Sequence, residues 1–455
     1  MKRLFGTDGM RGEAGIFPLD SATIKTVGAS LARRLGQKLD RAPLVVIGRD
    51  TRESGEWLEQ ALVAGLTSAG ARSQSAGVIT TPGVAFLART LPADAGIVIS
   101  ASHNAYLDNG IKIFAPSGRK LDEETERLIE GDIFAKREPS EEMHGGETSD
   151  HEAEVLQKRY LDFLSDEIGK NLSLRGLRLV LDCANGAASQ LAPRLFTRLG
   201  AEVTTINNNP DGRNINLNCG SLHMEDLQSE VVQQKANLGV AFDGDADRAL
   251  FVDTNGRLVN GDGSLWVLAR YLQARDSLAD NVVVSTVMSN IGLELALRSQ
   301  GISLVRADVG DKYVLEELMR LGASLGGEQS GHIIFPRLSL AGDGLVTTLS
   351  MLRAMREEGK ELHQLAEGFE VFPQILVNVR VNVKTPFDEV PAIQNAARNI
   401  ENTLSSEGRL LLRYSGTEPL ARVMIEGKNQ REIEKQAAEL AGVIKKNLGA
   451  GDSSQ

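Results

Sequence analysis

The sequence predicts an α/β fold of three similar domains with mixed sheets, followed by a smaller C-terminal α+β domain. Three segments share one local pattern, in which a short apolar strand leads through a polar loop into an amphipathic helix, a glycine and a second apolar strand. After Pro373 the pattern changes to a strand of alternating apolar and polar residues, a helix, two strands and a final helix. Repeated strand and helix units predict sheets covered by helices, with ligand sites in the loops at the strand ends.

Each of the three repeats is a candidate βαβ unit. Their first strands are predicted at residues 44–50, 179–182 and 282–285. Leucines at helical spacing follow each strand, at positions 58, 62 and 66, at 191, 195 and 199, and at 293 and 297. In the C-terminal part, strands are predicted at 375–383, 409–412 and 423–425, and a helix at 393–404.

These patterns divide the chain into four predicted domains. Residues 136–150 are charged, contain glycine and have no helical or strand period, which indicates a linker after the first domain. The next boundary rests only on where the third repeat begins, whereas Pro373 marks the last one. The predicted domains are therefore 1–150, 151–260, 261–373 and 374–455, with a disordered tail over 449–455.

Composition excludes several classes of function. Of the 455 residues, 42% are hydrophobic and 24% are charged, which is ordinary for a globular protein of several domains. The net charge of -11 argues against nucleic acid as the main partner. No apolar run is long enough for a signal peptide or a membrane span, so we expect a cytoplasmic protein without a membrane partner. Cys183 and Cys219 lack zinc-site spacing and are interpreted as buried apolar residues.

Asp243, Asp245 and Asp247 lie in one loop between two apolar runs. Three carboxylates this close repel one another unless a cation neutralises them, and their hard oxygen atoms suit Mg²⁺ or Ca²⁺. A calcium-binding EF-hand loop does not fit, because it needs Gly at its sixth position and Glu at its twelfth, where this chain has Arg248 and Thr254. A phosphatase of the haloacid dehalogenase type, with an aspartate nucleophile, remains an alternative on this loop alone.

Ser102 follows an apolar strand and stands among small polar residues. A serine at a strand end is placed for covalent catalysis, although a turn without catalytic function has the same composition. The metal loop favours catalysis, because a phosphoserine would bring close to two negative charges to a cation.

Two further loops carry groups suited to a sugar phosphate. Residues 328–332 place an acid, a hydroxyl and an imidazole in one glycine-rich turn, as sugar binding and proton transfer require. Residues 413–419, with Arg422 after them, place two guanidinium groups beside hydroxyls and a glycine, which is typical of a phosphate-binding loop. A hairpin turn also explains the second loop and does not exclude the function.

Together with residues 5–12, these loops resemble the motifs of the α-D-phosphohexomutase family, in the family's own order and over nearly the whole chain. Residues 5–12 resemble the arginine loop, 100–104 the phosphoserine loop, 243–248 the metal loop, 328–332 the sugar loop and 413–419 the distal phosphate loop. In one departure, Ala105 stands where the family usually has proline, which loosens the backbone but removes no reacting group. The resemblance implies four domains around a central cleft.

The resemblance also implies how the site is built. Ser102 would be phosphorylated in the active form, with one Mg²⁺ per subunit held by a phosphoserine oxygen and by Asp243, Asp245 and Asp247. The implied catalytic residues besides Ser102 are Arg11, Lys112, Arg248 and His332, of which Lys112 and His332 are the candidates for proton transfer. The implied substrate contacts are Val309, Gly310, Asp311, Glu328, Ser330, Arg413, Ser415, Gly416, Thr417 and Arg422.

The implied reaction moves a phosphoryl group between two hydroxyls of a hexose phosphate by way of Ser102. Residues 6–8, 309–313 and Gln329 favour glucosamine as the sugar, with glucose or mannose phosphates as the alternative. A hexosamine 1,6-bisphosphate would be both intermediate and activator, and the product would feed UDP-N-acetylglucosamine synthesis. The expected partner is a small sugar phosphate, and the resemblance suggests a homodimer. Phosphatase and noncatalytic sensor are the competing classes; the intact Ser102 and His332 argue against a sensor.

Overall fold

The computed structural model describes residues 3–6, 8–136, 150–415 and 418–449, which form two compact units. The first unit comprises Met1–Thr286 and Val305–Glu367, and the second comprises Val287–Leu304 and Gly368–Gln455. Most of the predicted linker and nearly all of the predicted C-terminal tail lie outside the described residues.

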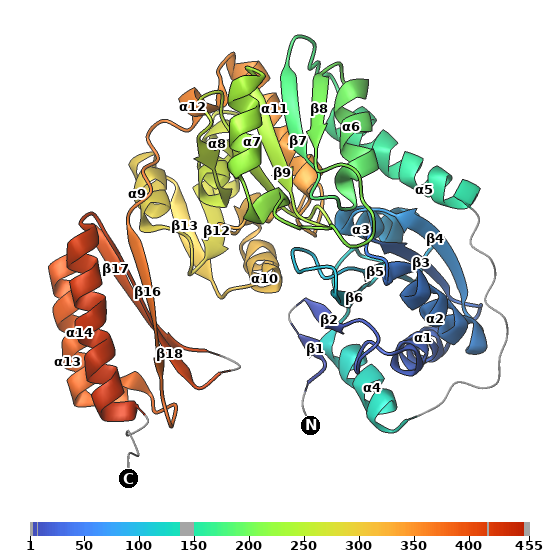
Figure 1. Cartoon of the computed structure of the whole chain (residues 1–455), viewed down its shortest axis with the longest axis horizontal. Coiled ribbons are helices and arrows are strands. Elements are labelled where there is room, and N and C mark those ends of the chain that lie inside the picture. Colours follow the sequence, from blue (N-terminus) through green and yellow to red (C-terminus); the bar gives the residue numbers. More distant parts are fainter. Residues whose placement is uncertain (1–2, 7, 137–149, 416–417, 450–455) are drawn as a thin grey trace. The chain divides into compact units, whose positions relative to one another are not determined.

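The first sheet has six strands in the order β1-β2-β6-β5-β3-β4 (Figure 1). Strand β3 is parallel to β4 and β5. Beyond β5 each strand is antiparallel to its neighbour: β6 to β5, β2 to β6 and β1 to β2. Helices α1, α2 and α4 share one buried core with this sheet. The elements are β1 (Phe5–Gly6), β2 (Gly9–Glu13), α1 (Ser21–Gly36), β3 (Leu44–Arg49), α2 (Gly55–Ser68), β4 (Arg72–Val78), α3 (Thr81–Thr90), β5 (Ala95–Ile99), β6 (Asp108–Phe114) and α4 (Glu123–Phe134).

The second sheet has the order β11-β10-β9-β7-β8. Strand β7 is parallel to β8 and β9, and β10 returns antiparallel to β9. The elements are α5 (Asp150–Asp162), β7 (Arg178–Asp182), α6 (Ala188–Arg198), β8 (Glu202–Ile206), α7 (Glu225–Gln233), β9 (Leu238–Phe242), β10 (Ala249–Val252) and β11 (Leu258–Val259).

The third sheet has the order β13-β12-β14-β15, with β12 parallel to β14 and β15 antiparallel to β14. Its elements and neighbouring helices are α8 (Gly261–Gln273), β12 (Val282–Thr286), α9 (Ile291–Ser299), β13 (Ser303–Ala307), α10 (Asp311–Leu321), β14 (Leu325–Gly327), β15 (Ile333–Ile334), α11 (Gly344–Glu358) and α12 (Leu362–Leu365).

The three sheets repeat one strand order, read as β6-β5-β3-β4, β10-β9-β7-β8 and β15-β14-β12-β13. The loop that leads from the second of these strands to the antiparallel first strand is in each case a loop with predicted chemistry. It contains Ser102 in the first sheet, Asp243 to Asp247 in the second, and Glu328 to His332 in the third. The internal repeat therefore places three functional loops at one equivalent position.

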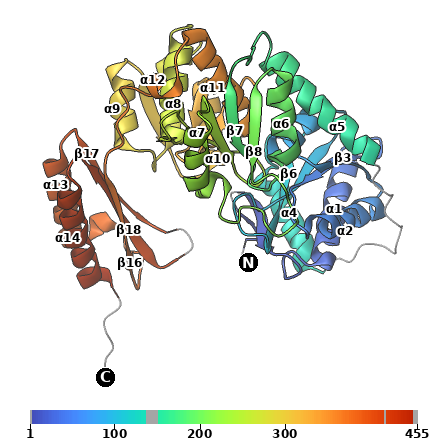
Figure 2. The ribbon, with the colours of Figure 1, turned by 45° about the horizontal axis from the view of Figure 1, so that its top comes forward.

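The second unit contains a three-stranded antiparallel sheet in the order β16-β18-β17. Helices α13 and α14 lie side by side on one face of it (Figures 1 and 2), and their apolar residues share one core with the strands. The elements are β16 (Gln374–Arg380), α13 (Pro391–Leu404), β17 (Gly408–Tyr414), β18 (Leu420–Gly427) and α14 (Gln430–Leu448). Strand β16 is shorter than predicted, because the N–H of Asn382 bonds to Leu448 in the final helix. Three mixed α/β sheets and a smaller C-terminal domain confirm the predicted fold class.

Candidate active site

Ser102 lies at the end of β5 in a strained backbone conformation. Its φ angle is 53°, a left-handed value that is uncommon for a residue with a side chain, and strain of this kind gathers at functional sites. The side chain is buried, and its Oγ donates a hydrogen bond of 2.5 Å to Oδ2 of Asp243. Nδ1 of His103 lies 3.4 Å from the same Oγ. The structure thus brings the predicted nucleophile and the metal loop together.

The loop around Ser102 is held by its backbone carbonyls. The buried guanidinium of Arg52 donates to the carbonyl oxygens of Ser102 (3.0 Å), Asn104 (2.9 Å) and Ala105 (2.5 Å). Nδ2 of Asn216 donates to the first two of these carbonyls as well, at 2.9 and 3.0 Å. Arg52 is itself fixed by a buried ion pair of 2.9 Å with Asp50. These contacts supply the rigidity that alanine, in place of proline, does not give.

Asp243, Asp245 and Asp247 form a buried cluster in which one oxygen atom from each lies within 4.8 Å of the others. Oδ1 of Asp245 is buried and has no hydrogen-bond partner among the described residues. Burial, reinforced by the charges of Asp247 and Asp245, raises the pKa of Asp243 well above its usual value. An unsatisfied carboxylate oxygen in a set of hard donors is what a divalent cation such as Mg²⁺ requires, so these residues fit a metal ion.

Lys112 lies beside the aspartate cluster. Its Nζ is 2.9 Å from Asp245, 3.2 Å from Asp8 and 3.6 Å from Asp247. Burial lowers the pKa of Lys112, but these three carboxylates outweigh it and raise the pKa well above the usual value. Lys112 is therefore an ammonium ion at neutral pH. Asp245, its nearest partner, also accepts a hydrogen bond of 2.6 Å from the Thr81 hydroxyl.

His332 lies between two carboxylates. Its Nδ1 is 3.5 Å from Asp247, and its Nε2 is 3.9 Å from Asp311. Burial lowers the pKa of His332, while Asp247 and Asp311 raise it to about 9. The N–H of Gly342 donates to Nε2 at 3.1 Å, which only an unprotonated nitrogen accepts. This hydrogen bond favours the neutral imidazole with its proton on Nδ1, toward Asp247.

The pKa of His103 is shifted in the opposite direction from that of His332. Burial, reinforced by the charges of Arg248 and Arg11, lowers the pKa of His103 to about 4. The imidazole next to Ser102 is therefore neutral at pH 7, which leaves one of its nitrogens free of a proton.

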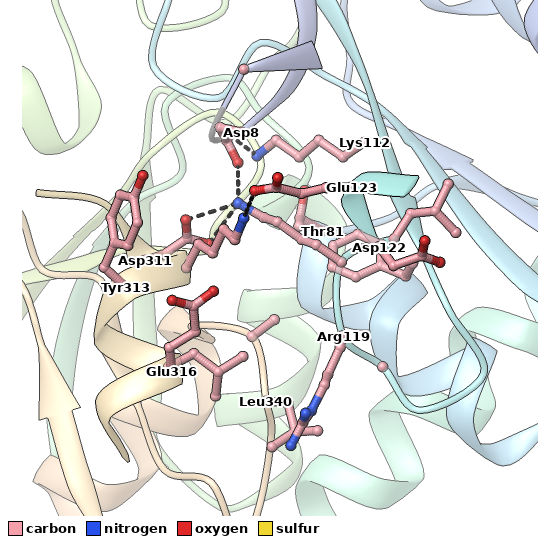
Figure 3. A pocket seen from close by; sticks show the side chains of 18 of the residues that line it. Asp8, Thr81, Lys112, Arg119, Asp122, Glu123, Asp311, Tyr313, Glu316 and Leu340 are labelled. Atoms are coloured by element: carbon pink, nitrogen blue, oxygen red, sulfur yellow. Dashed lines mark hydrogen bonds and ion pairs between the residues drawn. The ribbon is translucent and has the colours of Figure 1, made fainter. Parts of the chain in front are cut away.

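Two cavities meet at these residues. A cavity of about 410 Å³ is lined by predicted site residues, namely Arg11, Asp247, Arg248, Val309, Gly310, Asp311, Glu328 and His332, together with Asp8 and His103. A larger one of about 620 Å³ shares Asp8, Asp247, Asp311 and His332 with it and also receives Lys112. In Figure 3, Asp8, Lys112 and Asp311 converge at one side of this larger cavity, and Glu316 and Leu340 lie at the other.

The predicted sugar-binding residues come from two loops of the third sheet. Oε1 of Glu328 accepts a hydrogen bond of 3.2 Å from the N–H of Gly310, which joins the loop before α10 to the loop after β14. Oγ of Ser330 is buried and makes no hydrogen bond with any described residue. It therefore keeps a free donor and acceptor. Val309 is 42% exposed.

The predicted phosphate loop belongs to the second unit. Arg413 in β17 and Arg422 in β18 are directly opposite each other in the antiparallel register. Like charges in such a pair are destabilising unless an anion lies between them. Oγ of Ser415 lies 3.5 Å from the Arg422 guanidinium, and Lys384 donates to the Ser415 carbonyl at 2.6 Å. Gly416 and Thr417 lie outside the described residues.

Sequence reasoning missed several residues that the structure places at the site of the first unit. They are Asp8, Arg52, Thr81, His103, Lys120 and Asn216. In the second unit it missed Lys384, which contacts the predicted phosphate loop. Asp8 and His103 stand inside the quoted motifs, so their position alone could have marked them. Nothing in a single sequence shows that Arg52 or Asn216 reaches the carbonyls of the Ser102 loop.

Four sequence models of one family match the chain in order. They are those of phosphoglucomutase/phosphomannomutase alpha/beta/alpha domain I at residues 2–140, domain II at 158–256, domain III at 260–372 and the C-terminal domain at 376–443. The curated phosphoglucosamine mutase of Solibacter usitatus is 50% identical over 448 residues, which cover 98% of this chain and 99% of that one.

Solved structures give the same assignment. A phosphoglucomutase/phosphomannomutase family protein from Burkholderia thailandensis is 25% identical, with a TM-score of 0.79, and the match covers 98% of this chain and 99% of that one. The N-acetylphosphoglucosamine mutase of Aspergillus fumigatus, solved with GlcNAc-6P and magnesium, shares the fold with a TM-score of 0.66 at 17% identity, over 97% and 95% of the two chains. Among the described residues, no helix combines the length and apolar composition needed to cross a membrane. The chain belongs to the phosphoglucomutase/phosphomannomutase family of isomerases.

Proposed function

We propose that this chain interconverts glucosamine 6-phosphate and glucosamine 1-phosphate, the reaction of a phosphoglucosamine mutase, through a phosphoserine at Ser102. One observation carries the proposal: the Ser102 hydroxyl lies 2.5 Å from Asp243 within a buried acidic cluster that fits a metal ion. The name that the 50% identical relative bears supports glucosamine as the sugar.

Magnesium is the cation that we assign to Asp243, Asp245, Asp247 and an oxygen of the phosphorylated Ser102, one ion per subunit. Bound there, Mg²⁺ supplies positive charge that stabilises the transferring phosphoryl group. Two of the three aspartates are held in place by neighbours other than Ser102: Thr81 and Lys112 contact Asp245, and Lys112 also lies 3.6 Å from Asp247. Oxygen donors without nitrogen or sulfur favour such a hard cation over zinc.

The reaction consists of two phosphoryl transfers that balance. In the first, a hydroxyl of the sugar monophosphate attacks the phosphorus of phosphoserine, the bond from phosphorus to Ser102 Oγ breaks, the sugar oxygen loses a proton and Oγ gains one. In the second, Oγ attacks the other phosphate of the hexosamine 1,6-bisphosphate, loses its proton and becomes phosphorylated again, while the sugar oxygen regains a proton. The bisphosphate that escapes leaves the serine unphosphorylated, so added bisphosphate activates the enzyme.

Positive side chains favour these transfers by position and charge. Arg11 and Arg248 line the smaller cavity, where they face the negative charge of the phosphate. We assign Lys112 as the group that gives a proton to the leaving sugar oxygen, because its ammonium lines the larger cavity and a departing alkoxide is a stronger base than an amine. The ion pairs with Asp245 and Asp8 fix the position of the ammonium. His332 orients Asp247 through Nδ1. As a group for proton transfer, His332 is the second choice after Lys112.

Separate loops allow the sugar to bind in two orientations. We assign Glu328 and Ser330 to hydroxyls of the sugar in either orientation; Glu328 lines the smaller cavity together with Val309, Gly310 and Asp311, whereas Ser330 does not. The phosphate that does not react binds Arg413, Ser415, Gly416, Thr417 and Arg422. This division lets one phosphate react at Ser102 while the other is held.

The test is turnover of purified protein, with Mg²⁺ and catalytic glucosamine 1,6-bisphosphate, on glucosamine, glucose and mannose 6-phosphates in parallel. The proposal predicts glucosamine 1-phosphate as the product, with kcat/KM highest for the amino sugar. A higher kcat/KM for glucose or mannose 6-phosphate would change the assigned sugar and leave the mutase reaction in place. Release of inorganic phosphate without any 1-phosphate would indicate a phosphatase instead of a mutase. The homodimer and the cytoplasmic location stay predictions.

A further inference from the structure

Lys120 joins two domains of the first unit at the edge of the candidate active site. Its Nζ lies 2.8 Å from Asp8, in the turn before β2, and 2.8 Å from Asp311, the first residue of α10. The side chains of Lys120 and Asp311 are only 21% and 20% exposed, so solvent and salt screen this bridge less than a surface ion pair. Burial lowers the pKa of Lys120, whereas Asp311 and Asp8 raise it above the usual value, so the bridge keeps its charge.

Both carboxylates that Lys120 joins also contact groups of the transfer site. Asp8 forms ion pairs with Lys112, at 3.2 Å, and with Arg11. Asp311 lies 3.9 Å from Nε2 of His332 and directly follows Gly310, whose N–H is bonded to Glu328. A continuous path therefore runs from the proton donor of the first domain to the sugar-binding loop of the third.

The path closes into a circuit of neighbouring polar side chains. Lys112 contacts Asp8 and Asp247, the neutral His332 lies between Asp247 and Asp311, and Lys120 completes the circuit between Asp311 and Asp8. Asp8 shares Lys112 with the aspartate cluster, so any displacement of Asp8 changes the position of that ammonium. Without Lys120, the charge of Asp8 would fall entirely on Arg11 and Lys112, and the unpaired Asp311 would face the cavity that receives an anionic substrate.

We propose that Lys120 is a positioning residue for phosphoryl transfer: by binding Asp8 and Asp311 together, it fixes Lys112 and Arg11 against the sugar-binding loop and neutralises Asp311 toward the substrate. The inference rests on the proposed mutase function. It assigns Lys120 no contact with the reacting atoms, since its effect passes through the two carboxylates.

Arg89 offers a matched control. It lies near the end of α3 and donates a hydrogen bond of 3.1 Å to the carbonyl of Leu338, so it bridges the same two domains. Neither residue takes part in the circuit around Lys112. A loss of activity caused only by weaker attachment of the two domains would therefore appear in Arg89→Met as well as in Lys120→Met.

The experiment compares wild type, Lys120→Met, Lys120→Arg and Arg89→Met as full chains, with kcat, KM and thermal midpoint measured for each. We expect Lys120→Met to lose about tenfold or more in kcat/KM with a rise in KM, Lys120→Arg to recover most of it, and Arg89→Met to stay within about twofold of wild type. Lys120→Gln replaces Lys120→Met if the latter does not fold.

Equal losses in Lys120→Met and Arg89→Met, or a lower thermal midpoint with unchanged kcat/KM, would overturn the inference. A wild type without turnover on any sugar phosphate would refute the proposed function instead. In that case calorimetric binding of glucosamine 6-phosphate decides: about tenfold weaker binding to Lys120→Met supports the positioning role, and equal binding overturns it.

Discussion

The guanidinium of Arg52 donates a hydrogen bond of 3.0 Å to the backbone carbonyl of Ser102, and so holds the Ser102 loop through its main chain. Through this bond and its equivalents to Asn104 and Ala105, one buried arginine fixes the direction in which the Ser102 side chain leaves the loop. The strained φ of Ser102 persists because these contacts hold it.

Arg52→Lys is expected to lower kcat/KM about tenfold or more, because an ammonium cannot reach three carbonyls and Asp50 at once. The charge is kept, so the buried Asp50 is not left unpaired and the fold should survive. Steady-state kinetics and circular dichroism measure both effects. Arg49→Lys is the control: Arg49 pairs with Glu59 at 3.0 Å and should be near wild type. Equal kcat/KM values for Arg52→Lys and Arg49→Lys would show that Arg52 does not position Ser102.

Arg413→Ala should raise KM for the sugar phosphate by about tenfold or more, with a smaller effect on kcat, because a charge-assisted contact to the nonreacting phosphate is lost. Arg398→Ala, on the exposed side of α13, serves as control. An unchanged KM in Arg413→Ala would show that this loop does not bind the substrate.

Asp245→Asn should weaken Mg²⁺ binding by about tenfold or more, since the amide removes one negative charge from the cluster. Isothermal titration calorimetry on the unphosphorylated protein measures this without reference to turnover. Asp280→Asn, at an exposed position with a φ of 51° that asparagine tolerates, should bind Mg²⁺ as wild type does. Unaltered Mg²⁺ affinity in Asp245→Asn would place the metal elsewhere.

Asp343 predicts a defined pH dependence of stability. Burial raises its pKa to about 6, while Tyr160 and the N–H groups of Leu345 and Val346 donate hydrogen bonds to it. From about pH 4 to pH 6 the carboxyl of Asp343 binds more protons in the folded protein than in the unfolded chain. Rising pH therefore lowers the free energy of unfolding over this range, by about 3 kcal/mol in all. Above about pH 6 the contribution of Asp343 no longer changes.

Asp343→Asn keeps an acceptor oxygen and removes this titration. The difference in unfolding free energy, wild type minus variant, should therefore fall between pH 4 and pH 6 and then level off. Thermal or urea unfolding at several pH values measures it. Parallel curves for the two proteins would mean that Asp343 does not titrate in this range.

Much of the fold could be predicted from the sequence, because apolar strands and leucine-spaced helices recur at 44, 179 and 282. The approach of Ser102 to Asp243 was implied by the family resemblance, which assigns both residues to one metal ion, and the structure places them in contact. Asp8 and Lys120 could not be linked in the same way, since their ion pair depends on how the β1 to β2 turn and the residues after β6 fold together. Arg52 was missed for a similar reason: its partners are backbone carbonyls, which leave no mark on the sequence.

The relay through Ser102 is tested most directly by incubating the protein with glucosamine 1,6-bisphosphate carrying radioactive phosphate, mapping the labelled peptide, and then adding unlabelled glucosamine 6-phosphate. The account predicts label on Ser102 that passes to the sugar on this chase, with no label and no turnover in Ser102→Ala. Label on an aspartate of the 243–247 loop, or loss of the label as inorganic phosphate instead of sugar phosphate, would contradict it.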